Sequence, residues 1–207
     1  MAKIGIFGGS FNPIHNGHIN LAKQLLKCLE LDKMLIIPVF LPPHKQTKDF
    51  AQAKHRFNMV KLATENIKNI IPCDIEIKKE KPSYTIDTIN ELKNLYPNDE
   101  FYLIMGSDMF LSFKEWKSYE EILKKVTICV GSREKNDENA LISAKKQLQT
   151  EGAKVIICDI DILQLSSTEI RNILRNGESA KNLLNNKVLE YIKQNNLYDE
   201  EEWEYGD

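Results

Sequence analysis

The sequence has few cysteines, and their spacing fits neither a disulfide framework nor a zinc site. Its four cysteines are spread along 207 residues and form no CxxC pair. Three of them, Cys73, Cys129 and Cys158, lie in apolar runs typical of strands, where a buried thiol behaves as a small hydrophobic side chain. We therefore expect these three and Cys28 to be reduced thiols, which indicates a cytoplasmic protein.

Long hydrophobic runs are also missing. The longest apolar run, residues 34–43, contains Pro38 and is far shorter than the roughly 20 residues that a membrane-spanning helix needs. No charged segment followed by a long apolar stretch stands at the N-terminus, so the sequence shows no secretory signal. We expect no membrane association.

The sequence lacks an excess of charge of either sign. Its 28 Lys and Arg residues nearly balance 30 Asp and Glu residues, for a net charge of -2. A global basic field that would attract nucleic acid is therefore excluded, and a polyanionic ligand must be held by a local group of donors. Hydrophobic residues at 42% and charged residues at 28% are typical of a globular protein.

Segments typical of strands and helices alternate along the chain. This alternation predicts an α/β, Rossmann-like, doubly wound parallel sheet covered on both faces. We expect residues 1–164 to form that core, residues 165–198 a small C-terminal helical part, and residues 199–207 a flexible acidic tail. The expected strands are residues 3–7, 34–39, 73–77, 101–105, 126–130 and 154–158, and the expected helices are residues 17–29, 53–68, 83–96, 119–125, 139–150, 167–175 and 188–194.

The segment between the first strand and the first helix, GGSFNPIHNGH (residues 8–18), has the composition of a phosphate site. Gly8 and Gly9 let the backbone approach a ligand closely, and Gly17 leaves room for a phosphate. The N-terminus of the following helix offers unpaired N–H groups. His15 and His18 are three positions apart, so they share a face of that helix.

Other interpretations of this segment are weaker but remain open. The spacing lacks the Lys-Ser/Thr pair of a P-loop and the third glycine of a dinucleotide fingerprint. The glycines alone would also suit a tight turn with surface histidines. Two histidines could bind zinc, but no cysteine or carboxylate lies nearby at ligand spacing.

A second candidate site, LSSTEIR (residues 165–171), follows the last expected strand. Ser166 or Ser167 is suited to cap the next helix, and these hydroxyls together with Thr168 suit phosphate oxygens. Arg171 lies about one turn into the helix, where its guanidinium can reach two oxygens. An ordinary helix cap with a solvated arginine explains this motif equally well by itself. Its pairing with the first site favours phosphate binding.

These two motifs together resemble the HxGH superfamily of nucleotidylyltransferases. Three further segments extend the resemblance to the nicotinate-mononucleotide adenylyltransferase branch, and they occur in the family's order: PPHK (42–45), PSYTIDT (82–88) and GSDMFLSFKEW (106–116). Asn12 stands where many members have Asp, Ser107 replaces a usual Ala and Leu165 a usual Ile. Arg133 is not followed by the usual Pro-Gly turn.

The resemblance implies transfer of AMP from ATP to nicotinate mononucleotide, giving nicotinate adenine dinucleotide and pyrophosphate, in NAD biosynthesis. Mg²⁺ is expected to be carried mainly by ATP and water rather than by a metal site of the protein, and the sequence leaves homo-oligomerisation open. The implied catalytic residues are His15, His18 and Arg171. The implied ATP-binding residues are Gly8, Gly9, Ser10, Phe11, His15, Gly17, His18, Gly106, Asp108, Ser166, Ser167, Thr168 and Arg171. The implied nicotinate mononucleotide-binding residues are His44, Lys45, Tyr84, Thr85, Asp108, Trp116 and Arg133.

The acceptor residues have physical reasons and alternatives of their own. Tyr84 and Thr85 open a helix whose free N–H groups suit the carboxylate of nicotinate better than a neutral amide. Trp116 is suited to stack on the pyridine ring, or it is an ordinary core residue. Asp108 follows a strand and can accept from ribose hydroxyls. An exposed Lys45 could simply be solvated.

Three other functions compete with this one. A sister adenylyltransferase acting on phosphopantetheine or a flavin nucleotide would need different middle motifs. A class I aminoacyl-tRNA synthetase fragment would need an RNA-binding extension and a lysine-rich second motif. A nucleotide sensor without catalysis would retain the phosphate site alone.

The acidic tail is not part of any expected site. We predict that a chain truncated after Tyr198 keeps its turnover number, measured as pyrophosphate release. A large loss of turnover would show that the tail takes part in the reaction.

Overall fold

The computed structural model describes residues 1–41, 50–82, 84–132, 138–161 and 163–198. The expected acceptor residues His44, Lys45 and Arg133 and the acidic tail lie outside the described residues.

A six-stranded sheet forms the centre of the protein, with the strand order β3-β2-β1-β4-β5-β6. Every neighbouring pair of strands is parallel. The order reverses between β1 and β4, so these neighbours lead into helices on opposite faces, and the predicted doubly wound architecture is confirmed. The strands are β1 (Lys3–Gly9), β2 (Lys33–Pro38), β3 (Ile70–Pro72), β4 (Glu100–Gly106), β5 (Thr127–Ser132) and β6 (Lys154–Asp159).

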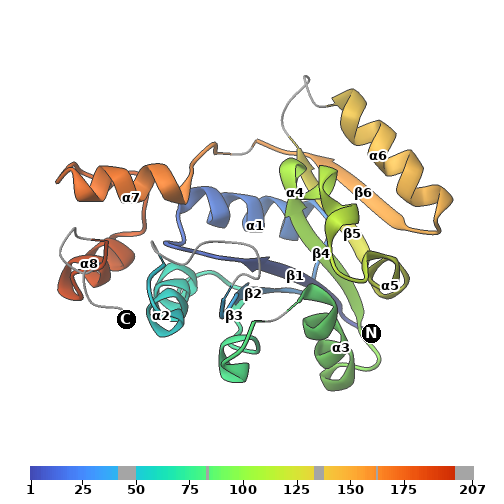
Figure 1. Ribbon diagram of the computed structural model, residues 1–207, viewed down its shortest axis with the longest axis horizontal. Coiled ribbons are helices and arrows are strands. Elements are labelled where there is room, and N and C mark those ends of the chain that lie inside the picture. The colour runs from blue at the N-terminus through green and yellow to red at the C-terminus, as the bar shows by residue number, and fades with distance from the viewer. Residues whose placement is uncertain (42–49, 83, 133–137, 162, 199–207) are drawn as a thin grey trace.

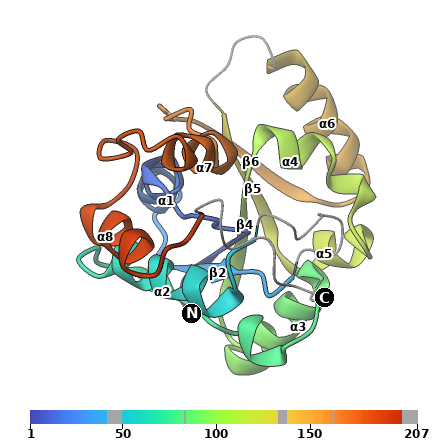
Figure 2. The ribbon, with the colours of Figure 1, turned by 60° about the vertical axis from the view of Figure 1, so that its left-hand side comes forward.

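Helices cover both faces of the sheet (Figures 1 and 2). Helices α1, α2, α7 and α8 lie on one face, and α3, α4, α5 and α6 on the other. The first group is α1 (Asn16–Cys28), α2 (Ala53–Thr64), α7 (Ser167–Arg175) and α8 (Asn186–Gln194). The second group is α3 (Thr85–Leu95), α4 (Ser107–Leu111), α5 (Tyr119–Lys125) and α6 (Glu138–Thr150), and short 3-10 helices span Ile77–Lys79 and Phe113–Glu115.

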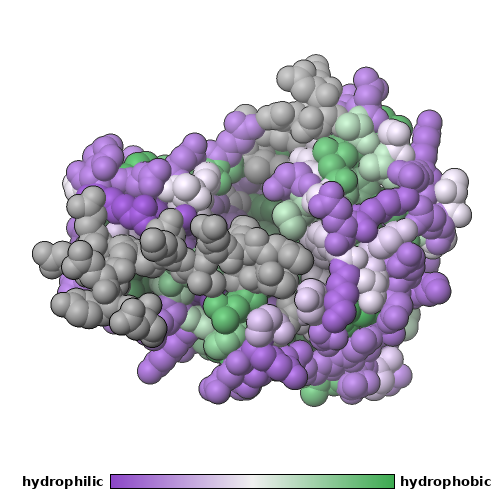
Figure 3. Space-filling view, in the orientation of Figure 1, coloured by the Kyte–Doolittle hydropathy of each residue, from purple (hydrophilic) through white to green (hydrophobic). Residues whose placement is uncertain are grey.

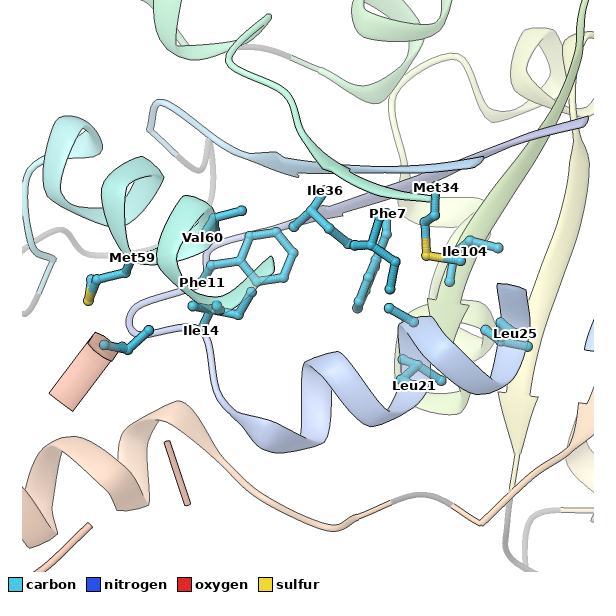
Figure 4. Close-up of a cluster of buried hydrophobic side chains, with 14 of the residues drawn as sticks. Phe7, Phe11, Ile14, Leu21, Leu25, Met34, Ile36, Met59, Val60 and Ile104 are labelled. Carbon is cyan, nitrogen blue, oxygen red and sulfur yellow. The ribbon is translucent and has the colours of Figure 1, made fainter. Parts of the chain in front are cut away.

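The two faces explain why the central strands are apolar almost throughout. In β2, Met34 and Ile36 point into the core beneath α1 and α2, while Leu35 and Ile37 point into the core on the other face. A strand covered on both sides has no solvent-facing row, so its sequence loses the usual alternation. Figure 4 shows the first of these cores, in which side chains of the sheet meet those of α1 and α2.

The face of the protein seen in Figure 3 is mostly polar where its residues are coloured. Hydrophilic side chains cover most of the face seen in Figure 3, with smaller hydrophobic patches between them. Within the described part of the chain, no helix is long and apolar enough to cross a membrane.

One expected strand was wrong. The edge strand β3 spans Ile70–Pro72, whereas residues 75–76 form a turn that leads into the 3-10 helix. Proline has no N–H to continue a ladder, so pairing with β2 ends soon after Pro72. The neighbours Ile75 and Glu76 are both buried, which no strand with one solvent-facing row allows. The sequence analysis also missed α4, which begins directly after β4.

The expectation of four free thiols was also wrong. Cys28, the last residue of α1, and Cys158 in β6 form a disulfide with a Cα–Cα distance of 6.8 Å. They are 130 positions apart, so their proximity depends on α1 packing over the sheet. Cys73 and Cys129 are free, and burial raises the pKa of the Cys129 thiol to about 12.

This pairing predicts a thiol count. Protein purified without reductant and then denatured should react with two equivalents of a thiol reagent, from Cys73 and Cys129, and with four after reduction. The Cys28→Ser variant should show three equivalents without reduction, because Cys158 is released. Four equivalents from the unreduced wild type would contradict the disulfide.

Candidate active site

Strands β1 and β4 separate towards their carboxyl ends. The two strands pair from Lys3 with Glu100 to Ile6 with Leu103. Beyond that point, β1 continues to Gly9 and β4 continues to Gly106. Ligands of open α/β sheets bind at such a point, outside the carboxyl ends of the strands where the strand order reverses. Both glycine-ended strands therefore lead into one candidate site.

The chain leaves β1 through a tight loop that is anchored in the core. Phe11 has a φ of 46°, in the left-handed region, and its ring is 1% exposed. A Cβ atom on Gly9 would lie 2.9 Å from that ring, so glycine is needed there to admit Phe11. Figure 4 shows Phe11 and Ile14 near Val60 of α2. The buried side chains fix this loop from below.

The two histidines of the loop cap α1 reciprocally. His15 Nδ1 accepts a hydrogen bond from the main-chain N–H of His18, and His18 Nδ1 accepts from the N–H of His15, both at 3.3 Å. This is a capping box made of imidazoles instead of Ser and Glu. The rings stack with their centroids 3.6 Å apart. The edge-on ring of Phe11 lies 5.0 Å from that of His18.

Both histidines are neutral at physiological pH. Burial lowers the pKa of His15 to about 4. Burial, and then the neighbouring His15, hold the pKa of His18 well below its ordinary value. A neutral imidazole carries one N–H, and Nδ1 of each ring accepts a main-chain hydrogen bond, so the proton lies on Nε2. The pair therefore presents two Nε2–H donors without a positive charge.

The glycines of the loop play different parts. A Cβ on Gly8 would meet no atom within 4 Å, so this glycine faces open space at the end of β1. A Cβ on Gly17 would lie 2.8 Å from the carbonyl oxygen of Leu163 and 3.0 Å from His15 Nδ1. The absence of a side chain at Gly17 thus lets the segment before α7 pass directly over α1 and leaves room for the His15 ring.

The second predicted motif docks onto the first. Ser166 caps α7, its hydroxyl accepting from the N–H of Thr168 at 3.2 Å. The Ser167 hydroxyl donates to the carbonyl of Pro13 at 3.0 Å. Arg171 Nη1 donates to the carbonyl of Asn12 at 2.9 Å, and its Nη2 lies 3.3 Å from the Thr168 hydroxyl. The structure therefore brings together the N-termini of α1 and α7.

Sequence analysis missed the buried arginine that supports this loop. Arg56 is 1% exposed, and its guanidinium donates to the carbonyls of Ser10, Phe40 and Ala51 at 2.7–2.9 Å. A signal was present, because Arg56 shares a helical face with the buried Met59, Val60 and Ala63. An arginine on an apolar face needs buried acceptors.

Two of the predicted acceptor motifs, residues 82–88 and 106–116, come close together on the other face of the sheet. Tyr84 is the residue that precedes α3, and Thr85 is its first residue. The ammonium of Lys117 lies 4.0 Å from the centroid of the Tyr84 ring, which joins the start of α3 to the segment after α4. Trp116 is half-buried, packing on Phe113 with ring centroids 5.3 Å apart.

Gly106 and Asp108 lie at the end of β4, next to the end of β1. Asp108 is exposed in the first turn of α4. A Cβ on Gly106 would lie 3.0 Å from Asp108 Oδ1, so glycine gives this carboxylate its place over the strand end. Among the described residues there is no group of three or more His, Cys, Asp or Glu side chains that could hold a metal ion.

Comparisons with known proteins agree on one family. The cytidylyltransferase-like family model matches residues 6–173. The chain is 38% identical to a Clostridium tetani protein named "Probable nicotinate-nucleotide adenylyltransferase", covering 96% of this chain and 100% of that protein. A Caldicellulosiruptor saccharolyticus protein with the same name is 40% identical over 96% of this chain and 100% of its own.

Solved structures share the fold. A Plasmodium falciparum nicotinic acid mononucleotide adenylyltransferase complexed with NaAD superimposes with a TM-score of 0.78 at 22% identity, covering 96% of this chain and 98% of that chain. The same protein complexed with APC gives a TM-score of 0.77 at 21% identity, covering 96% and 98%.

The buried histidines predict a specific loss of stability in acid. His15 has a pKa of 6.5 when exposed and about 4 in the folded protein. Between these values the unfolded chain binds the extra proton, so the free energy of unfolding falls as the pH falls. From pH 7 to pH 5, His15 should lower the free energy of unfolding by about 2 kcal/mol.

The variant His15→Asn tests this. Asn keeps a side-chain oxygen that caps α1 but does not titrate. In denaturant unfolding, the free energy of unfolding should fall by about 2 kcal/mol less in the variant than in the wild type between pH 7 and pH 5. Both proteins have the same carboxylates, so the contribution of these groups cancels. Equal losses in the two proteins would show that His15 is not buried in the neutral form.

Proposed function

The chain belongs to the cytidylyltransferase-like family and, within it, to the nicotinate-nucleotide adenylyltransferases, and we infer that it transfers AMP from ATP to nicotinate mononucleotide. The products are nicotinate adenine dinucleotide and pyrophosphate, which places the enzyme in NAD biosynthesis. The observation that carries the catalytic assignment is the stacked pair of neutral histidines at the N-terminus of α1, docked against the N-terminus of α7. Because ATP is its substrate, we place the enzyme in the cytoplasm.

The reaction is a displacement at the α-phosphorus of ATP. An oxygen of the acceptor's phosphate forms a new bond to that phosphorus, and the bond to the pyrophosphate oxygen breaks. The attacking oxygen is already ionised near neutral pH, so no general base is needed. The protein's task is to align the two phosphates and to stabilise the charge that develops.

The histidine pair suits the α-phosphate. Nε2–H groups of His15 and His18 donate to its oxygens as negative charge builds there. The positive end of the α1 dipole adds to this field. Gly8 faces open space, where a phosphate can approach the main chain. These donors stand ready before the reaction, so little reorganisation is needed in the transition state.

The start of α7 suits the leaving pyrophosphate. Thr168 is exposed there, and the hydroxyl of Ser166 lies 3.2 Å from its main-chain N–H. Arg171 already contacts the Asn12 carbonyl, which fixes its guanidinium beside the loop of the histidines. Its positive charge offsets part of the negative charge that builds on the leaving oxygen of pyrophosphate.

The acceptor lies beyond the ends of β1 and β4, on the side of the site where α3 and α4 begin. The N–H groups at the start of α3, near Tyr84 and Thr85, hold the nicotinate carboxylate. Lys117, fixed over the Tyr84 ring, adds a positive charge close to that carboxylate. The exposed side of Trp116 offers a stacking face to the pyridine ring. Asp108 accepts from a ribose hydroxyl.

Mg²⁺ accompanies ATP in this proposal. The donors at the α-phosphate are imidazoles, whereas Mg²⁺ prefers oxygen ligands and keeps several waters. The described residues therefore do not suit a magnesium cage of the protein, and the ion is bound by phosphate oxygens and water. Its chemistry is to neutralise charge on the triphosphate, and the roles of the side chains above do not depend on its position.

Pyrophosphate release with alternative acceptors tests the proposal. Nicotinate mononucleotide, nicotinamide mononucleotide, phosphopantetheine and flavin mononucleotide are offered in parallel with ATP and Mg²⁺. We expect release mainly with nicotinate mononucleotide. Release with another acceptor would overturn the assignment of α3 and Trp116, and no release with any would indicate a nucleotide-binding protein without catalysis.

A matched pair of histidine variants locates the chemistry. His18→Ala should lower kcat by about 10²–10³, the usual effect of removing one preorganised donor. His55→Ala removes a histidine of α2 whose Nδ1 is 2.9 Å from the Tyr191 hydroxyl, away from the loop, and should keep kcat. Equal losses in both variants would point to a general effect on folding.

A further inference from the structure

We propose that Tyr198 is a positioning residue for adenylyl transfer, because its hydroxyl holds Asn12 and thereby the loop that carries His15 and binds Arg171. This inference rests on the proposed function, since its main effect is measured in that reaction. It assigns a role to the last described residue of the chain, which none of the phosphate-binding motifs includes.

The contact is direct and buried. Tyr198 is 1% exposed, and its hydroxyl lies 2.8 Å from Asn12 Oδ1 across 186 positions of sequence. The N–H of Ala51, just before α2, donates to the same oxygen at 3.0 Å. An amide oxygen has two lone pairs, and both are used here. The Asn12 side chain thus joins the loop to α2 and to the C-terminal segment.

The hydroxyl acts as a donor under all ordinary conditions. Asn12 Oδ1 can only accept, so the Tyr198 hydroxyl must donate. Burial raises the pKa of Tyr198 above its ordinary value, so the hydroxyl keeps its proton near neutral pH. The contact is therefore a permanent part of the structure and does not titrate with activity.

Asn12 is held from two sides. Its side chain is bound by Tyr198 and Ala51, while its main-chain carbonyl accepts from Arg171 Nη1 at 2.9 Å. His15 follows three positions later and caps α1. A shift of Asn12 therefore moves the partner of Arg171 and the entry to the histidine pair together. Misplacements of about 1 Å can cost 10²-fold in rate.

The backbone near Tyr198 supports a specific placement. Tyr198 has a φ of 73° and Asn196 a φ of 50°, both in the left-handed region that non-glycine residues rarely adopt. Such conformations persist when the surrounding structure determines them. Here the N–H of Leu197 is bonded to the carbonyl of Ile192, and the Tyr198 ring lies in the same core as Phe11.

The same C-terminal region provides a matched control. Tyr191 of α8 also places its hydroxyl in two hydrogen bonds to α2, with His55 Nδ1 and with Asn58 Nδ2, each at 2.9 Å. It anchors the C-terminal helix without touching the loop. Tyr191→Phe and Tyr198→Phe each remove one hydroxyl and leave the ring, so they differ mainly in whether Asn12 is affected.

The experiment compares kcat, KM for ATP and Tm of the two variants. We expect both to lower Tm by a few degrees, as the loss of a buried hydrogen bond does. Tyr198→Phe should lower kcat about tenfold and change KM for ATP less than about threefold, because alignment rather than binding is lost. Tyr191→Phe should keep kcat. If the two variants have the same kcat, Tyr198 is only structural and the inference is wrong.

Substitutions of Asn12 test the partner. Asn12→Leu removes the acceptor oxygen and should lower kcat at least as much as Tyr198→Phe. The double variant should be no slower than Asn12→Leu alone, because both changes break one contact. Asn12→Asp keeps an oxygen for the hydroxyl and should lose much less. If the losses of kcat were additive in the double variant, the two residues would not act through one contact and the inference would be contradicted.

Failure of the proposed function is recognised separately. If the wild type releases no pyrophosphate with any acceptor, the function is wrong but the geometry remains testable by NMR of the imidazole groups. The His15 and His18 signals should then shift in Tyr198→Phe and remain unchanged in Tyr191→Phe. Unchanged signals in both variants would overturn the inference regardless of activity.

Discussion

The guanidinium of Arg56 ties together three segments on which the site depends. Its donors bond to the main chain after β1 at Ser10, after β2 at Phe40 and before α2 at Ala51. Burial lowers the pKa of Arg56 to about 10, so it stays charged near neutral pH. A buried cation is tolerated when its donors are satisfied. Removing the side chain would leave several buried carbonyls without donors.

From this anchor the loop before α1 is held through its own carbonyl groups. Those of Ser10, Asn12 and Pro13 accept from Arg56, Arg171 and Ser167. In a trans peptide the N–H points opposite to the carbonyl, so a carbonyl of Ser10 bonded to Arg56 turns the N–H of Phe11 the other way. The hydrogen bond that supports the loop at Ser10 therefore also sets the direction of the Phe11 N–H.

The sequence predicted the elements that depend on local patterns, and it missed those that depend on distant contacts. Five of the six strands, and the helix starts at which both candidate phosphate motifs lie, follow from apolar runs, glycines and capping residues that are visible within short segments. The edge strand β3 was placed too late because the residues after it looked like a strand. In the structure, Ile75 and Glu76 belong to a turn that is buried. Nothing in the spacing of Cys28 and Cys158 indicates that α1 crosses β6.

The residues that support the site are the least visible in sequence. Tyr198 stands in an ordinary amphipathic end of the chain, and only the folded structure brings it to Asn12. Arg56 could have been noticed by its apolar neighbours on α2, but its three acceptors come from loops without a motif. Sequence motifs record groups that touch ligands, whereas supports of this kind become visible in the packing.

The neutral state of the histidine pair also depends on residues that support the site through packing. In the proposed reaction a neutral pair would stabilise negative charge through its two Nε2–H dipoles, which stand in fixed positions before the reaction begins. Neutrality requires burial, and the Phe11 ring and the reciprocal caps provide it. The same burial makes the fold less stable in acid, so the sensitivity to pH follows from holding the imidazoles in their neutral form.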